Sequence, residues 1–220
     1  MSAQRLAARS AVGAAVLVLV LGVVPRAEIR DQVFSFEEDA IGAVPAGFFF
    51  AGARQNSAGI WAIKGIGPKH HLSHTGDPTI RMRGMSLASV VEEAPVNLTL
   101  SVKVRFVDGD RAAGLIWRYR DSSNFYALGV NLSDRTASIF RVTDGNRVRL
   151  AFAADLDLDP DAWHSIGIAQ VADQMRAQVD GISLMRARDR TLRSGRAGIW
   201  SAGNSSNWFD DVRITSAGGQ

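Results

Sequence analysis

The stretch NLTLSVKVRFV, residues 97–107, decides the fold class, because apolar and polar side chains alternate along it one by one. Its apolar positions are Leu98, Leu100, Val102, Val104 and Phe106, and the residues between them are Thr, Ser, Lys and Arg. Successive side chains of a β-strand point to opposite faces. The stretch therefore predicts a strand with one buried face and one solvated face.

The chain after residue 28 repeats this pattern in short segments separated by turn residues. Asp-Gly pairs at 144–145 and 180–181 lie between alternating runs, which indicates hairpins, and no long amphipathic helix is indicated. Half-buried strands must stack as two sheets to hide their apolar faces. We therefore predict an all-β fold, an antiparallel β-sandwich of the jelly-roll type, over residues 28–215. Residues 216–220 are expected to form a flexible tail.

Residues 1–27 favour an export signal. Arg5 and Arg9 precede an uncharged apolar run at 11–24, which has the length of a signal-peptide core and is short for a membrane span. Cleavage after Ala27 is expected, although Pro25 fits the cleavage motif poorly. The segment thus predicts export to the periplasm or the cell exterior, and the alternative is an uncleaved N-terminal membrane anchor.

The composition narrows the function classes. The formal net charge of +3 comes from the first 26 residues, which hold three arginines and no acid. The remaining body is neutral overall, which argues against a nucleic-acid partner. Lysine occurs only at positions 64, 69 and 103, and the excess of arginine is interpreted as coding bias. The absence of cysteine excludes disulfides and thiol catalysis. We expect a monomer.

Several stretches together resemble a known group of proteins. They are FSFEEDAIGAVPAGF (34–48), LSHTGDPT (72–79), AAGLIWRYRDSSNFYALGVN (112–131), DAWHSIGI (161–168), VDGISL (179–184) and GIWSAGNSSNWFDDVRI (198–214). The set is similar to exported bacterial proteins of the concanavalin A-like lectin/glucanase superfamily. Within that superfamily it resembles the laminin-G-like group labelled 3-keto-disaccharide hydrolase or family 16 glycoside hydrolase-like. The resemblance implies a sandwich, but this fold carries lectins, hydrolases and adhesion modules alike.

Two adjacent aspartates in the last strand suggest a cation site. Asp210 shares the parity of Val212 and Ile214, so we expect its carboxylate at the rim of the inward face, where a charge needs a partner. Carboxylates from the N-terminal segment would suit Ca²⁺ if the two ends of the domain pair. The resemblance implies a structural calcium, with Asp210 the best match and Glu38 and Asp39 as further ligands. The alternative is that Asp210 caps backbone N–H groups or pairs with an arginine.

Candidate sugar-binding residues combine aromatic faces with forked polar groups. They are Arg118, Arg120, Asn124, Tyr126, Trp200, Asn204 and Trp208. For each single aromatic residue, a place in the core is the competing interpretation. Arg118 and Arg120 lie out of phase with Trp117 and Tyr119, so both arginines are expected on a wet concave face.

No catalytic residue is assigned. Glycoside hydrolysis requires two carboxylates, and the acid pattern that the glucanases of the superfamily carry on one strand is absent. The histidines of KHHLSH, residues 69–74, are interpreted as a solvated loop or strand edge, with a metal site as the alternative. His164 is expected to pack or to form hydrogen bonds.

The sequence therefore favours non-catalytic glycan binding on the concave sheet. The first alternative is a glycoside hydrolase or lyase that acts on 3-keto-disaccharides, as the family label implies. The second alternative is a structural or protein-binding sandwich.

Overall fold

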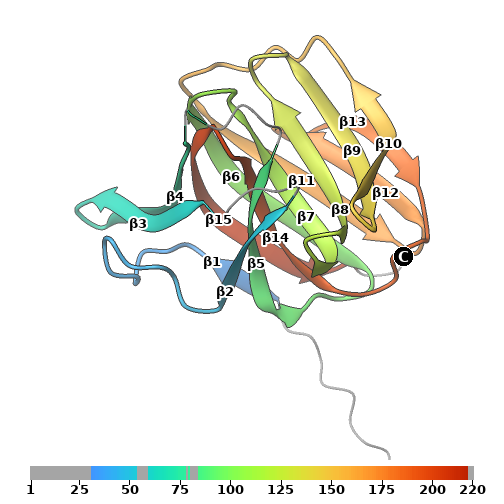
Figure 1. The fold of residues 1–220 in the computed structure, drawn as a ribbon, viewed down its shortest axis with the longest axis horizontal. Coiled ribbons are helices and arrows are strands. Elements are labelled where there is room, and N and C mark those ends of the chain that lie inside the picture. The colour runs from blue at the N-terminus through green and yellow to red at the C-terminus, as the bar shows by residue number, and fades with distance from the viewer. Residues whose placement is uncertain (1–30, 54–58, 78, 80–83, 218–220) are drawn as a thin grey trace, which may run out of the picture.

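The computed structural model describes residues 31–53, 59–77, 79 and 84–217, and every regular element in this part of the chain is a β-strand. The strands form two antiparallel sheets that stack face to face, which confirms the predicted jelly-roll sandwich (Figure 1). Among the described residues, no helix is long and apolar enough to cross a membrane.

Sheet A contains the strand of residues 97–107 and the last strand of the chain. Its order is β13–β12–β11–β6–β15–β4–β3, and β1 pairs with β15 beside this row. Its strands are β1 (Gln32–Phe34), β3 (Ile60–Ile66), β4 (Lys69–Thr75), β6 (Leu98–Asp108), β11 (Trp163–Val171), β12 (Gln174–Val179), β13 (Ile182–Arg188) and β15 (Ser206–Ser216). The β3–β4 hairpin projects from one side of the sandwich (Figure 1).

Sheet B supplies the second layer, in the order β10–β9–β8–β7–β14–β5–β2. Its strands are β2 (Phe48–Ala53), β5 (Met85–Glu93), β7 (Ala112–Asp121), β8 (Asn124–Asn131), β9 (Thr136–Thr143), β10 (Asn146–Ala153) and β14 (Arg196–Ala202). The hairpins predicted at the Asp-Gly pairs are confirmed as β9–β10 and β12–β13. Both residues of each pair have positive φ, as a two-residue hairpin turn of the I′ type requires.

The core lies between the two sheets. All five apolar residues of the alternating stretch in β6 are buried. They pack in one cluster with inward-facing residues of sheet B such as Leu115, Leu128 and Ile199. Burying a side chain of this size stabilises the fold by about 1.5–3 kcal/mol, so the interlocked faces account for a stable sandwich without disulfides.

Several strand pairs contain register shifts, and two of these bulges bear on candidate functional residues. In β7 the register shifts at Arg118, which has a φ of 52°, and in β15 it shifts between Asp210 and Arg213, around Asp211 with a φ of 49°. A bulge sets two residues against one on the partner strand and thereby changes which face the following side chains occupy. Both bulges decide where candidate functional residues point.

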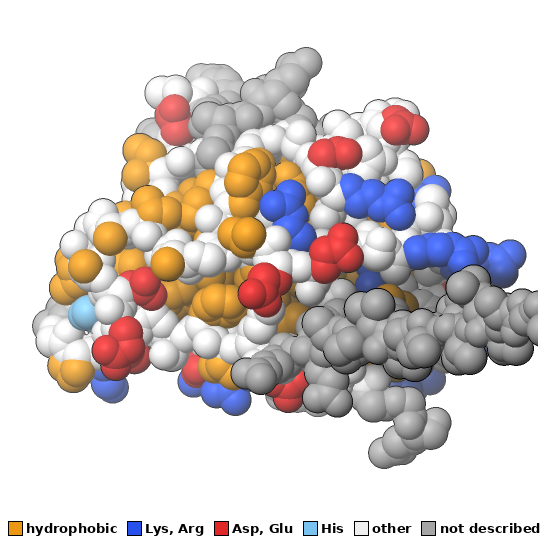
Figure 2. Space-filling model, turned by 90° about the horizontal axis from the view of Figure 1, so that it is seen from below, with side chains coloured by type: hydrophobic (Ala, Val, Ile, Leu, Met, Phe, Trp, Pro, Cys, Tyr) orange, Lys and Arg blue, Asp and Glu red, His pale blue; other side chains and the backbone are white. Residues whose placement is uncertain are grey.

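The surface mixes apolar and charged groups. β1, β2 and β5 lie on the lower side of Figure 1, and Figure 2 shows this side with apolar side chains among acidic ones and basic ones gathered toward one side. Val33, Phe49 and Val91 are exposed on these three strands. Apolar atoms contribute much of any protein surface, so exposure of single residues of this kind marks no binding face.

Candidate functional site

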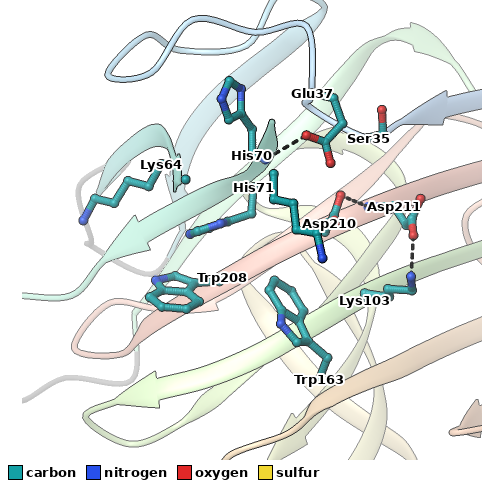
Figure 3. A pocket seen from close by; sticks show the side chains of 12 residues that line it. Ser35, Glu37, Lys64, His70, His71, Lys103, Trp163, Trp208, Asp210 and Asp211 are labelled. Carbon is teal, nitrogen blue, oxygen red and sulfur yellow. Dashed lines mark hydrogen bonds and ion pairs between the residues drawn. The ribbon is translucent and has the colours of Figure 1, made fainter. Parts of the chain in front are cut away.

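The main candidate site is a hollow of about 810 Å³ on the outer face of sheet A. We call it the β15 pocket. It is lined by Ser35, Glu37, Lys64, Gly65, Lys69, His70, His71, Lys103, Trp163, Trp208, Asp210 and Asp211, most of which Figure 3 shows around one opening. The lining comes from β3, β4, β6, β11, β15 and the segment after β1, so the pocket exists only once sheet A is assembled.

A gap in strand pairing opens this pocket. One side of β15 pairs with β6 along its length, whereas the other side pairs with β4 at 207–209 and with β1 at 212–214. Asp210 and Asp211 lie between these two partners. The β1–β15 pairing confirms the prediction that the opening and closing segments of the domain lie side by side.

The bulge places both aspartates on the outer face. Phe209 and Val212 are both fully buried although they are an odd number of residues apart, because the extra residue of the bulge lies between them. The expectation that Asp210 lies at the rim of the inward face is therefore wrong. Asp210 and Asp211 both line the β15 pocket instead.

Three rings from β4, β15 and β11 form an aromatic wall. The ring centroids of His71 and Trp208 are 4.5 Å apart, and those of Trp163 and Trp208 are 6.5 Å apart. Trp163 is 38% exposed, so its ring is open to a ligand. The guanidinium of Arg105, on β6 between the two tryptophans, lies 5.3 Å from the Trp208 ring centroid. The wall is thus held by neighbouring strands rather than by loops.

The two aspartates have opposite electrostatic environments. Lys103 Nζ lies 2.7 Å from Asp211 Oδ2, and Arg213 donates to Asp211 Oδ1 at 3.2 Å. The hydrogen bond from Lys103 is the largest cause that lowers the pKa of Asp211. Burial raises the pKa of Asp210, and repulsion from Asp211 and Glu37 adds to this rise. Asp211 is therefore neutralised by cations, whereas Asp210, within the described part of the chain, accepts only the backbone N–H of Asp211, at 2.7 Å.

Glu37 and the histidines complete the rim. The backbone N–H of His70 donates to Glu37 Oε2 at 2.9 Å, which ties the segment after β1 to β4. Burial lowers the pKa of His71, and the positive charges of Lys64 and His70 lower it further. His71 is consequently neutral at pH 7 and presents an uncharged ring beside Trp208. The pocket thus combines an aromatic wall, acceptor carboxylates and cationic donors.

The predicted groove residues do not form one groove. Of the seven, only Trp208 lines the β15 pocket. Trp200 and Asn204 line a second hollow of about 550 Å³ on sheet B. Arg120 is exposed and reaches the Ser194 carbonyl at 3.5 Å, and the amide of Asn124 donates to Asp121 within a turn.

Tyr126 belongs to the core. It is fully buried, and its hydroxyl donates to Asp189 Oδ1 at 2.5 Å while it accepts the backbone N–H of Leu192. Arg141 Nη1 lies 2.5 Å from the other oxygen of Asp189. The hydroxyl therefore braces the loop after β13 and is not open to a ligand.

The expected exposure of Arg118 is wrong. Arg118 is 1% exposed, and its guanidinium donates to the carbonyl oxygens of Pro95 and Val96. The bulge in β7 turns Arg118 inward and carries Tyr119 to the apolar cluster on the outer face of sheet B, while Trp117 stays in the core between the sheets. Parity along the strand assigned Arg118 to the wrong face because it assumes unbroken alternation.

The second hollow holds one exposed phenylalanine, Phe152, and a tryptophan that lies against the sheet. Trp200 is 8% exposed, and its indole N–H donates to the Leu128 carbonyl at 3.0 Å. A Cβ added to Gly129 would lie 2.7 Å from the Trp200 ring, so the ring lies directly against the sheet. Phe140 is fully buried, with the guanidinium of Arg147 3.7 Å from its ring centroid. The β15 pocket is the better candidate, because it sets two tryptophan rings side by side, one of them 38% exposed, whereas Phe152 is the exposed ring of the second hollow.

The calcium ligands named from the sequence are only partly brought together. Asp210 lines the β15 pocket, but Glu38 and Asp39 do not, and the acid of the N-terminal segment that acts on Asp210 is Glu37. Within the described residues no group of three or more His, Cys, Asp or Glu side chains is arranged to hold a metal ion. Calcium binding by Glu38 and Asp39 together with Asp210 thus has no geometric support, and a calcium ion stays a prediction.

The histidines of β4 are not a solvated loop. His74 is fully buried, and its Nδ1 lies 2.8 Å from the Ser205 carbonyl oxygen. His70 and His71 lie on opposite faces of β4, at the strand edge that the sequence interpretation allowed. His164 forms the expected hydrogen bonds, with Nδ1 2.7 Å from Asp180 Oδ2 and Nε2 2.7 Å from the Asp159 carbonyl.

Sequence reasoning missed several lining residues. Trp163 stands next to His164 at the start of β11, and its outward parity in an alternating strand was a usable signal. Lys64, Lys69 and Lys103 were noted only as rare residues. Glu37 was indicated only as one of the acids of the N-terminal segment that would lie beside the last strand, and the pairing of β1 with β15 brings it to the pocket.

Comparisons with known proteins support the fold. No family model matches the chain, and no curated protein matches its sequence. A carbohydrate-binding module of family 66 from Bacillus subtilis aligns with a TM-score of 0.63 and 18% identity, over 77% of this chain and 96% of that one. A β-glucanase from Bacillus licheniformis aligns with a TM-score of 0.60 and 11% identity, over 86% of this chain and 99% of that one.

A third similar structure is domain 4 of an extracellular arabinanase from Geobacillus stearothermophilus, solved with arabinotriose. Its TM-score is 0.56 at 10% identity, over 86% of this chain and 94% of that domain. These identities are low, so the likeness concerns the fold alone. The chain thus shares the sandwich fold of this carbohydrate-binding module and of this β-glucanase.

Proposed function

We propose that this chain is an exported protein that binds carbohydrate in the β15 pocket. The observation that carries the proposal is the aromatic wall of Trp163 and Trp208 beside carboxylates and cations. Aromatic faces stack on the apolar faces of sugar rings, and charged groups around them bind the hydroxyls. The names of the similar structures, a carbohydrate-binding module and a domain solved with arabinotriose, add support for this ligand class.

The carboxylates are suited to hydroxyl recognition. Asp210 and Glu37 each accept a backbone N–H bond, which leaves acceptor capacity on both groups, since an ionised carboxylate has about four lone-pair sites. Hydrogen bonds to charged groups are stronger than those between neutral groups. A sugar ring stacked on Trp208 would therefore gain both apolar contact and orientation in the same pocket (Figure 3).

The experiment is a glycan array followed by calorimetry with the best ligand. Trp208→Ala is expected to weaken binding about tenfold to a hundredfold, because stacking on one aromatic ring contributes roughly 1–3 kcal/mol by analogy with base stacking. Phe49→Ala is the matched control, since Phe49 is 46% exposed on β2, outside the pocket.

The outcomes separate the rival functions. Binding that survives both Trp208→Ala and Trp163→Ala would place the site elsewhere, with the second hollow as the next candidate. If no glycan on the array binds, a structural or protein-binding role is favoured. Recovery of shortened oligosaccharide in place of intact ligand would favour a glycoside hydrolase or lyase.

A further inference from the structure

All three lysines of the chain line the β15 pocket. Lys64 lies on β3, Lys69 on β4 and Lys103 on β6, so they are dispersed along the sequence and meet only in the folded sheet. The chain has 25 basic residues in total, and the arginines that border this pocket are engaged, Arg105 with the Trp208 ring and Arg213 with Asp211. Coding bias toward arginine explains why lysine is rare. It does not explain why the few lysines converge on one hollow.

Lysine and arginine differ in the recognition they support. Arginine offers a rigid fork that matches a carboxylate through two bonds, whereas lysine is a compact charge on a flexible stem with three donors. A lysine therefore attracts an anionic group without fixing its orientation. Lysines in place of arginines suit a pocket in which the sugar ring is oriented by stacking and the charge only needs a nearby cation.

The ammonium groups on one side of the pocket are available to a ligand. Lys103 is paired with Asp211 at 2.7 Å, but within the described residues neither Lys64 nor Lys69 forms an ion pair. Both are exposed on the β3–β4 hairpin, next to His70 and His71. Figure 3 shows Lys64 at the outer edge of the opening, with Glu37 and Asp210 across from it. The pocket thus has a basic side on the hairpin and an acidic side at the bulge.

From this division we infer that the ligand is an anionic carbohydrate, a glycan with carboxylate or sulfate groups on its rings. This inference rests on the proposed carbohydrate-binding function. The ring stacks on Trp163 and Trp208, its hydroxyls donate to Asp210 and Glu37, and its anionic group lies toward Lys64 and Lys69. A purely neutral sugar would use the carboxylates and the aromatic wall and leave the hairpin lysines without a role.

The experiment compares matched acidic and neutral glycans with the full-length chain. The probes are uronate oligosaccharides and the same compounds after reduction of their carboxylates to alcohols, together with sulfated oligosaccharides and their unsulfated parents. The best acidic probe is expected to bind at least about tenfold more tightly than its neutral partner, as the loss of one hydrogen bond to a charged group would predict. Binding of the acidic probe is also expected to weaken with rising salt.

Variants assign the effect to the lysines. Lys64→Gln combined with Lys69→Gln is expected to bring the acidic probe down to the affinity of the neutral one. Arg176→Gln combined with Arg186→Gln is the matched control, because these exposed arginines lie opposite each other on β12 and β13, outside the pocket, and remove the same charge.

Equal affinity for acidic and neutral probes, unchanged in the double lysine variant, would overturn the inference and leave the proposed function intact. If the arginine control weakens binding as much as the lysine variant does, overall charge and not the pocket is responsible, which also overturns it. Loss of binding to every glycan class would instead refute the proposed function. Preference for the carboxylated or the sulfated series tells which anionic group the pocket accepts, and either one supports the inference.

Discussion

At the residue scale, His74 is a titratable group kept neutral by the fold. Its side chain is fully buried on the inward face of β4, and its ring centroid lies 4.7 Å from that of Trp61. Burial lowers the pKa of His74 to about 4, and the hydrogen bond with the Ser205 carbonyl raises it only partly against this. In the unfolded chain this histidine has an ordinary pKa of about 6.5. Between pH 4 and pH 6.5 the unfolded chain therefore binds more protons at His74 than the folded protein does.

This difference predicts a loss of stability on acidification. As pH falls below about 6.5, His74 becomes protonated in the unfolded chain but stays neutral in the folded protein. The free energy of unfolding therefore decreases until pH reaches about 4. The upper limit of this loss is about 3 kcal/mol. Urea unfolding at several pH values should show the slope in the wild type and a flatter profile in His74→Gln.

Two carboxylates with a lowered pKa act in a separate pH window. The pKa of Asp211 and that of Asp189 are both lowered, so their stabilisation is present above the unfolded value of about 3.9 and is lost below it. His71→Gln is the control for a partly buried histidine of the same strand, whose pKa is also lowered. An unchanged slope between pH 6.5 and 4 in His74→Gln would contradict the assignment to this residue.

At the element scale, alternation predicted the strands and failed at the bulges. The inward face of β6 follows from sequence alone, because no bulge interrupts its five apolar residues. Arg118 and Asp210 were assigned to the wrong faces because an extra residue in β7 and in β15 changes the phase. Positive φ at Arg118 and Asp211 is a property of the folded strand. Aspartate tolerates positive φ better than arginine does, but neither residue type requires it, so the sequence does not locate the bulges.

The bulge in β15 is predicted to create the site. Asp210 pairs with Lys103 and Arg213 pairs with Ser101, so deleting Asp211 would restore continuous pairing and keep Val212 inward. The deletion is expected to change the free energy of unfolding by less than about 2 kcal/mol. It would also draw β1 toward β4 by about 3.4 Å, narrow the gap and abolish glycan binding, as measured by calorimetry.

Replacing Asp211 with asparagine tests whether binding depends on the gap beside β15 or on the charge of Asp211. Asp211→Asn keeps a residue type that tolerates positive φ but removes the ion pairs with Lys103 and Arg213. It should retain most of the binding, because the gap stays open. If the deletion binds as well as the wild type, the bulge does not form the site. If Asp211→Asn loses binding completely, the charge matters more than the gap.

At the scale of the whole molecule, the fold class followed from sequence, whereas the site did not. Strand alternation and turn residues are local signals, so the sandwich was within reach of sequence reasoning. The β15 pocket joins residues 35–37, 64–71, 103, 163 and 208–211, and their meeting depends on the order of strands in sheet A. That order is set by packing between distant segments, for which one sequence holds no local pattern.

The first strand of the domain, β1, pairs with the last strand and completes sheet A beside the pocket. β1 pairs with β15 through Gln32, Val33 and Phe34, and the Phe34 ring lies 4.8 Å from that of Phe48 in an edge-on contact. Residues 1–30 lie outside the described part of the chain, so the predicted export signal is not tested by the fold. Cleavage after Ala27 would leave β1, which begins at Gln32, on the mature chain, so the prediction is compatible with an intact sheet A.

Two truncations test this boundary together with export. Removal of residues 1–27 should leave the free energy of unfolding unchanged, because β1 begins at Gln32. Removal of residues 1–34 should lower it by about 2–4 kcal/mol, since it takes away a strand and the Phe34 contact. In a bacterium that exports the full chain, the mass of the soluble product is expected to match cleavage after Ala27. A full-length mass in the membrane fraction would favour the uncleaved anchor, and destabilisation by the shorter truncation would show that residues before β1 belong to the folded body.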